Sequence, residues 1–119
     1  MVKTKTKPLL PSLREKKRYL AYEVISSKKY NDAIEINKAI IDAAKEFLGN
    51  LGMAKAGILP LNDQFNQNLQ RGILRVNNKH LDNLKASFIF VNKIIDNDAI
   101  IRSIGASGIL KKTQQKYLN

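Results

Sequence analysis

One strongly patterned helix in the first half of the chain limits the fold to a few classes. Asp32 is a good N-cap residue, and Glu35 three positions later completes a capping box. A Gly- and Asn-containing stretch at 49–52 predicts where the helix ends. A helix with one apolar stripe must bury it against another layer, so a second layer is required. The residues of the stripe are Ile36, Ile40, Ala43, Phe47 and Leu51.

Strands are predicted on both sides of this helix. Residues 19–26 are rich in aromatic and β-branched types and predict the first strand. Further strands are expected over 53–61, 69–77 and 99–104. The Asn- and Gln-rich stretch 62–68 is expected to be a long, mobile loop between two of them.

Two more helices complete the predicted order. The second begins at Asn77 or Asn78 and continues through 81–95, where apolar residues recur at helical spacing. Within it, residues 88–95 are rich in β-branched and aromatic types, so this run could form either a helix or a strand. The last helix covers 109–118. This β-α-β-β-α-β order plus a C-terminal helix predicts an α+β, ferredoxin-like or RNA-recognition-like sandwich, with two helices on one face of a four-stranded antiparallel sheet.

The chain is expected to divide into an arm and one domain. Its 119 residues suit a single domain. Residues 1–11 hold three lysines and two prolines in a polar stretch, and they predict a flexible basic arm. Residues 12–119 then form one RNA-recognition-like domain.

The charge of the chain favours a polyanionic partner. Twenty-one Lys and Arg stand against ten Asp and Glu, which gives a formal net charge of +11. Residues 1–30 carry +7, 70–95 carry +4 and 96–119 carry +2, whereas 31–69 carry −2. If folding brings the basic segments together, they form a phosphate-binding surface. The alternative is that the tails only aid solubility and the remaining charge is scattered.

The residue types argue against a catalytic or metal centre. There is no Cys, and His80 is the single His, so thiol catalysis and a His-based metal site are not expected. The carboxylates form no paired nuclease centre. We expect no catalytic residue, no metal and no directly bound cofactor. The sequence has no apolar run of the ~18 residues that cross a bilayer, and no signal-peptide pattern, so a cytoplasmic protein without membrane contact is expected.

The predicted third strand begins like the base-stacking motif of RNA-recognition domains but does not continue like it. Arg71-Gly72 fits the Lys/Arg-Gly start of that motif. Its aromatic positions hold Ile73, Arg75 and Asn78, so base stacking, worth ~1–3 kcal/mol per base, is mostly unavailable. Recognition of RNA shape and backbone, or use of the sheet for protein contact, is therefore favoured.

The Gly-Ala-Ser-Gly stretch at 105–108 has two interpretations. Amide groups at the start of the last helix, with Lys111 and Lys112 nearby, would hold an RNA phosphate. The other interpretation is a plain strand-to-helix turn that Ser107 caps. No Gly-Lys-Ser/Thr follows, so it is not a nucleoside-triphosphate motif.

Four motifs occur in order along the chain. They are Leu-Arg-Glu-Lys-Lys-Arg-Tyr at 13–19, Leu-Gly-Asn-Leu-Gly-Met-Ala-Lys-Ala at 48–56, Gly-Ile-Leu-Arg-Val at 72–76, and Ala-Ile-Ile-Arg-Ser-Ile-Gly-Ala-Ser-Gly at 99–108. Together they resemble the archaeal ribonuclease P protein component 2 family, relatives of eukaryotic Pop-five. The family often has Thr where this chain has Ile109.

The resemblance implies a protein subunit of ribonuclease P, the ribonucleoprotein endoribonuclease that removes the 5′ leader from precursor tRNA. In that family the RNA is the catalyst and Mg²⁺ acts with it, so the protein alone is not expected to be active. The implied partners are ribonuclease P RNA, precursor tRNA indirectly, and a barrel-shaped protein subunit in a heterodimer or heterotetramer, with self-association also open. The alternative is another structural RNA-binding protein, such as a ribosome-associated one, without a role in tRNA processing.

We expect basic side chains to neutralise phosphates near the active core of that RNA. Ion pairs in place of phosphate repulsion stabilise the folded RNA and lower its need for free Mg²⁺. Arg suits this role because its planar fork binds two phosphate oxygens at once. The predicted RNA-binding residues are Arg14, Lys16, Lys17, Arg18, Arg71, Arg75, Lys111 and Lys112.

Overall fold

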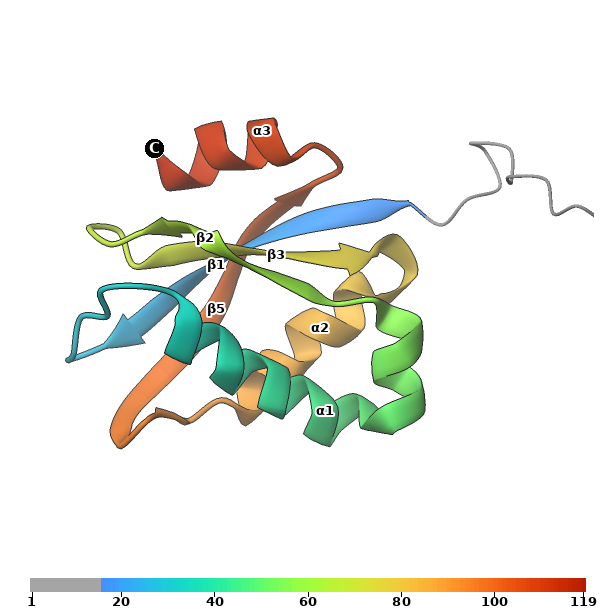
Figure 1. Cartoon of the computed structure of the whole chain (residues 1–119), viewed down its shortest axis with the longest axis horizontal. Coiled ribbons are helices and arrows are strands. Elements are labelled where there is room, and N and C mark those ends of the chain that lie inside the picture. The colour runs from blue at the N-terminus through green and yellow to red at the C-terminus, as the bar shows by residue number, and fades with distance from the viewer. Residues whose placement is uncertain (1–15) are drawn as a thin grey trace, which may run out of the picture.

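A computed structural model of the chain describes residues 16–119 (Figure 1). The arm predicted over 1–11 and the candidate Arg14 lie outside the described residues. The main elements are β1 (Lys17–Ser26), α1 (Ile34–Ala56), β2 (Leu59–Asn66), β3 (Arg71–Asn77), α2 (Leu81–Ser87), β4 (Lys93–Ile94), β5 (Asn97–Ser107) and α3 (Leu110–Thr113). Three short turns of helix complete them: η1 (Asn78–His80), η2 (Phe88–Phe90) and η3 (Gln114–Leu118).

The strands form one antiparallel sheet in the order β2-β3-β1-β5-β4. The predicted α+β class with an antiparallel sheet is confirmed, but the sheet has five strands, so the prediction of four is wrong. The additional strand, β4, pairs only Lys93 with Asp98 and Ile94 with Asn97. It forms because Ile95, at a φ of 60°, turns the chain back onto β5.

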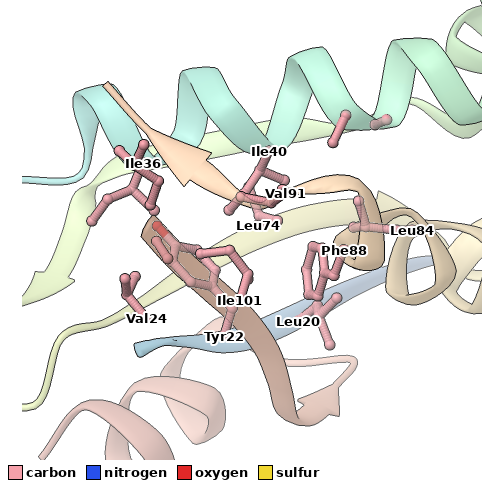
Figure 2. Packing of buried hydrophobic residues seen from close by; sticks show 14 of the residues in the cluster. Leu20, Tyr22, Val24, Ile36, Ile40, Leu74, Leu84, Phe88, Val91 and Ile101 are labelled. Carbon is pink, nitrogen blue, oxygen red and sulfur yellow. The ribbon is translucent and has the colours of Figure 1, made fainter. Parts of the chain in front are cut away.

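The two faces of the sheet are covered by different helices. α1 and α2 pack on one face, and α3 with η3 lies over the other (Figure 1). The core lies between the sheet and the α1–α2 layer, where burial of apolar side chains supplies the main stabilisation (Figure 2). Its members include Leu20, Tyr22, Val24, Ile36, Ile40, Leu74, Leu84, Phe88, Val91 and Ile101.

The helix α1 starts as predicted but ends later. Asp32 lies one residue before the observed N-cap, and its Oδ1 accepts a hydrogen bond from the Ile34 N–H at 3.0 Å. Gly49 adopts a φ of 71° and kinks the helix, which then continues to Ala56 and stops at the left-handed Gly57. The strand predicted over 53–61 is therefore wrong for 53–58, because β2 begins only at Leu59. Good helix formers and a fully buried Ala56 make continuation favourable.

The predicted apolar stripe of α1 is only partly core. Ile36, Ile40 and Ala43 are buried, whereas Phe47 is 41% exposed and Leu51 is 69% exposed. The outer half of the stripe therefore lies at the surface. The spacing of apolar residues shows which face of a helix is apolar. It does not show how much of that face the sheet covers.

The prediction of a mobile loop over 62–68 is wrong for most of its length. β2 extends through Asn66 and pairs Leu59 with Arg75 and Asn66 with Arg71, with an irregularity between. The polar side chains of this strand bond to other elements rather than to solvent alone. Asn62 Oδ1, for example, accepts a hydrogen bond from Asn37 Nδ2 of α1 at 2.6 Å.

The second helix is shorter than predicted. α2 ends at Ser87, and η2 leads into the extended chain that forms β4. Phe88, Val91 and Ile94 are all buried and join the core, although only Phe88 lies in a helical turn. Residues 88–95 are thus neither one helix nor one strand. The last predicted helix, 109–118, corresponds to α3 and η3.

Candidate nucleic-acid interface

Three segments far apart in the sequence meet at the end of the sheet where β1 begins (Figure 1). Lys17 of β1 lies opposite Asn77 at the end of β3, and Tyr19 lies opposite Ser107 at the end of β5. The backbone at Gly108 passes close to the Lys17 carbonyl oxygen, which a Cβ at Gly108 would approach to 4.0 Å. α3 therefore starts beside the first residues of β1.

Five of the predicted RNA-binding residues lie at this end, which we call the basic end. Arg18 is half-buried and the other four are exposed. The Arg18 Nε donates to Asn78 Oδ1 at 2.8 Å, and the Lys17 ammonium donates to Asn77 Oδ1. These neutral amides orient two cations without cancelling their charge. Within 16–119, no carboxylate forms an ion pair with any of the five. The residues of the basic end are Lys16, Lys17, Arg18, Lys111 and Lys112.

Two exposed lysines that were not predicted lie beside the basic end. Lys79 follows Asn78 in the turn after β3. Lys55 lies in the last turn of α1, where its carbonyl oxygen accepts a hydrogen bond from Asn77 Nδ2 at 2.8 Å. The positive charge of segment 70–95 was a signal for Lys79. Lys55 gave no such signal, because its segment is acidic overall and was predicted to be a strand.

Arg75 extends the positive charge from the basic end onto the sheet. It pairs with Tyr19 of β1 and with Leu59 of β2 in the ladder, and its side chain is half-buried. Its Nε atom is buried, and no acceptor among the described residues bonds to it. Among the described residues no carboxylate forms an ion pair with Arg75, so its positive charge next to Tyr19 is uncompensated.

Arg71 is placed differently. It lies four residues before Arg75 in β3, or about 13 Å at 3.3 Å per residue. Its Nε pairs with Glu23 Oε2 at 3.2 Å, and its Nη1 donates to the Tyr117 carbonyl at 3.1 Å. Glu23 Oε1 in turn pairs with Arg102 Nη2 at 2.6 Å. The structure thus does not bring Arg71 to the basic end, and its Nε and Nη1 donate within the protein.

The turn interpretation of residues 105–108 is the better one. Gly105 to Ser107 still belong to β5. Ser107 Oγ accepts a hydrogen bond from the Ile109 N–H at 3.2 Å, which occupies one amide that a phosphate would need. The α3 helix that follows, Leu110–Thr113, is four residues long and carries the exposed Lys111 and Lys112.

The sheet face that many RNA-recognition domains use for base stacking is covered here. Ala21 and Ile73 lie on that face and are fully buried. α3 and η3 lie above it (Figure 1). Bases therefore have no open aromatic platform on the middle strands, in agreement with the missing aromatic residues of β3.

A buried tyrosine is paired with a buried amide of α1. Tyr22 donates from its hydroxyl to Asn37 Oδ1 at 2.6 Å, and burial raises the pKa of Tyr22 well above its usual range. In the part of the chain that the structure describes, no group of three or more His, Cys, Asp or Glu is placed to hold a metal ion. The helices of that part include none long and apolar enough to cross a membrane.

Comparison with known proteins gives a consistent family. The sequence profile of the Rpp14/Pop5 family matches residues 18–118. The chain is 41% identical over 113 residues to ribonuclease P protein component 2 of Pyrococcus furiosus, covering 95% of this chain and 92% of that protein. It is 38% identical over 117 residues to the protein of that name from Thermococcus gammatolerans, covering 98% and 95%. The corresponding protein of Methanocaldococcus jannaschii is 32% identical over 112 residues, covering 94% and 80%.

Proposed function

Because the chain belongs to the Rpp14/Pop5 family, we propose that it is a protein subunit of ribonuclease P that binds the catalytic RNA through the basic end. In this role it supports removal of the 5′ leader from precursor tRNA, while the RNA performs the cleavage with Mg²⁺. The relatives named ribonuclease P protein component 2 support the subunit role.

The observation that carries the RNA-binding proposal is the convergence of uncompensated cations. Lys16 to Arg18 and Lys111 to Lys112 come from opposite ends of the chain, yet β1 and α3 are in contact. Each cation placed on a phosphate releases condensed counterions, which favours binding. Phosphate contacts carry no base sequence, so this surface suits a folded RNA recognised by shape and backbone.

We further propose that the fold is RNA-recognition-like, with β4 added at one edge. The order β2-β3-β1-β5, with α1 and α2 on one face, supports the split β-α-β arrangement. The covered sheet face argues that this protein binds RNA at the end of the sheet rather than on its face.

An exposed apolar patch supports a protein partner as well. Phe47 and Phe90 lie together with ring centroids 5.6 Å apart, and both are about two-fifths exposed. Leu51 and Ile89 add side chains that are 69% and 79% exposed. Exposed apolar side chains on two elements in contact, here α1 and η2, typically mark an interface. We propose that this patch of Phe47, Leu51, Ile89 and Phe90 binds the barrel-shaped ribonuclease P protein subunit.

Reconstitution tests the proposed function. The full chain is added to ribonuclease P RNA from the same organism with precursor tRNA, and 5′-leader removal is measured at rising Mg²⁺. We expect the protein to lower the Mg²⁺ requirement, and we expect no cleavage by the protein alone. Equal binding to ribosomal RNA and no effect on cleavage would favour the alternative, a structural RNA-binding protein outside tRNA processing. The cytoplasmic location stays a prediction.

A further inference from the structure

The C-terminal segment 110–118 is held over the sheet by polar side chains of β2 and β3. We infer that Gln64, Asn66 and Arg71 form a clasp that fixes this segment and thereby positions Lys111 and Lys112 at the basic end. The inference rests on the proposed function for its effect on RNA binding. The clasp itself rests on contacts within the chain.

The clasp consists of three sets of hydrogen bonds. Arg71 Nη1 donates to the Tyr117 carbonyl at 3.1 Å, and Asn66 Nδ2 donates to the Leu118 carbonyl. The side-chain amides of Gln64 and Gln114 bond to each other. Carbonyl groups in the last turn of a helix have no partner within the helix, so donors from β2 and β3 satisfy them.

Glu23 fixes the direction of the Arg71 fork. Its Oε2 holds Arg71 Nε at 3.2 Å, and its side chain is only 19% exposed. Because Arg71 Nε donates to Glu23, its Nη1 points toward the C-terminal segment and reaches the Tyr117 carbonyl. Arg71 is therefore a positioning residue for the segment rather than a phosphate ligand.

Two further contacts, at Tyr117 and at Thr113, complete the docking of the segment. The Tyr117 ring lies on Gly105 of β5, where an added Cβ would come within 2.8 Å of Tyr117 Cε1. Thr113 is fully buried and its Oγ1 donates to the Ile109 carbonyl at 3.0 Å. Together with the clasp, these contacts determine which side of the helix points outward.

Docking matters because a helix this short is unstable by itself. Isolated helices below ~12–15 residues are marginal in water. The positions of Lys111 and Lys112 therefore depend on the tertiary contacts of segment 110–118. If the segment is released, the two lysines are no longer concentrated beside Lys16 to Arg18, and their phosphate contacts are lost.

The test removes the two uncharged members of the clasp, Gln64 and Asn66, so that the net charge does not change. Gln64→Ala with Asn66→Ala is compared with Lys111→Ala with Lys112→Ala, and binding to a transcript of ribonuclease P RNA is measured against salt. We expect both double variants to bind more weakly and to lose up to about 1.4–1.8 from the slope of log K against log[salt], the share of two phosphates. The variant that combines all four substitutions should lose no more affinity and no more salt slope than either double variant. A clasp variant with wild-type affinity and slope, or additive losses in the quadruple variant, would overturn the inference.

The RNA-binding test is accompanied by a matched control variant and by a protease measurement that needs no RNA. Gln67→Ala with Asn68→Ala removes two exposed amides of the same stretch, and Gln67 Nε2 donates to Asn31 Oδ1 rather than to segment 110–118. Carboxypeptidase should release C-terminal residues faster from the clasp variant than from the wild type or this control, because the segment opens more often. Equal release rates would refute the clasp even if RNA binding is normal. If the wild type fails to bind the RNA, the proposed function fails, while the digestion still decides the clasp.

Discussion

The phenol ring of Tyr22 in β1 lies directly on Gly72, its cross-strand partner in β3. A Cβ built on Gly72 would lie 2.6 Å from Tyr22 Cζ, so the ring occupies the space of a side chain. Gly72→Ala should therefore lower the free energy of unfolding by about 1–3 kcal/mol, the usual cost of overpacking. Thermal or urea unfolding measures it. Gly108→Ala is the control, since its Cβ would meet nothing closer than 4.0 Å. Equal losses in both variants would contradict this account.

Tyr22→Phe should destabilise the fold through Asn37. The Tyr22 hydroxyl donates to Asn37 Oδ1 at 2.6 Å, and Asn37 is buried. Removing the donor leaves a buried acceptor with one bond fewer, which costs about 1–3 kcal/mol. Urea unfolding at neutral pH reports the loss. A variant as stable as the wild type would show that another donor replaces the hydroxyl.

The same residue should make the protein sensitive to alkali. Burial raises the pKa of Tyr22 in the folded state above its ordinary value of 10.0. The neutral phenol therefore contributes stability below that ordinary pKa. This contribution falls as the pH rises further, because the unfolded chain releases the proton first. Between pH 9 and 11, the wild type should lose more stability than Tyr22→Phe. Parallel pH curves would show that Tyr22 does not cause the alkaline loss.

Charge removal at the basic end should raise the Mg²⁺ requirement of RNA cleavage. Changing Lys16, Lys17 and Arg18 together to Ala removes three phosphate contacts, worth about 0.7–0.9 each in the salt slope of RNA binding. Cleavage of precursor tRNA by the reconstituted particle, titrated with Mg²⁺ and salt, measures the effect. Lys45→Ala, an exposed cation on α1, should leave both titrations unchanged. Normal cleavage by the triple variant across both titrations would remove the basic end from the RNA interface.

Arg75 and Arg71 should behave differently although both were predicted to bind RNA. Arg75→Gln should cost about one phosphate contact, a decrease of ~0.7–0.9 in the salt slope, with no change in carboxypeptidase sensitivity. Arg71→Lys keeps the charge but loses the fork that reaches both Glu23 and the Tyr117 carbonyl. It should expose the C-terminal segment to the enzyme. Identical digestion of the two variants would argue against the distinction.

The apolar patch should matter for partner binding more than for stability. Phe47→Ala with Ile89→Ala removes exposed side chains, so unfolding should change by about 1 kcal/mol or less. Affinity for the barrel-shaped subunit, measured by calorimetry or size-exclusion chromatography, should fall at least ~10-fold if either side chain is an interface anchor. Ile25→Ala with Ile100→Ala removes an exposed pair from β1 and β5 and serves as the control. Unchanged affinity of Phe47→Ala with Ile89→Ala for that subunit would contradict the proposal. Loss of a self-dimer instead would show that the patch binds a second copy of this chain.

Local patterns predicted the elements whose signals lie within a few residues. Asp32 marks the start of α1 because a capping oxygen bonds an amide two positions away. The aromatic and β-branched residues of 19–26 predicted β1, because such side chains pack well on a pleated sheet. The charge blocks at both ends of the chain also predicted most of the basic end. These predictions succeeded because their signals are properties of residues close together in the sequence.

Tertiary structure decided what depends on partners distant in sequence. Arg71 is occupied by Glu23, 48 residues away, and by Tyr117, 46 residues away, which no local pattern reveals. The amide-rich stretch 62–68 was predicted to be a loop, because its hydrogen-bond partners in α1 and in the C-terminal segment are distant in the sequence. Phe47 resembled a core residue because spacing shows that a helix has an apolar face, not how far the sheet beneath it extends. In each case the sequence determined the chemistry of the side chain, and long-range packing determined what remained available to bind.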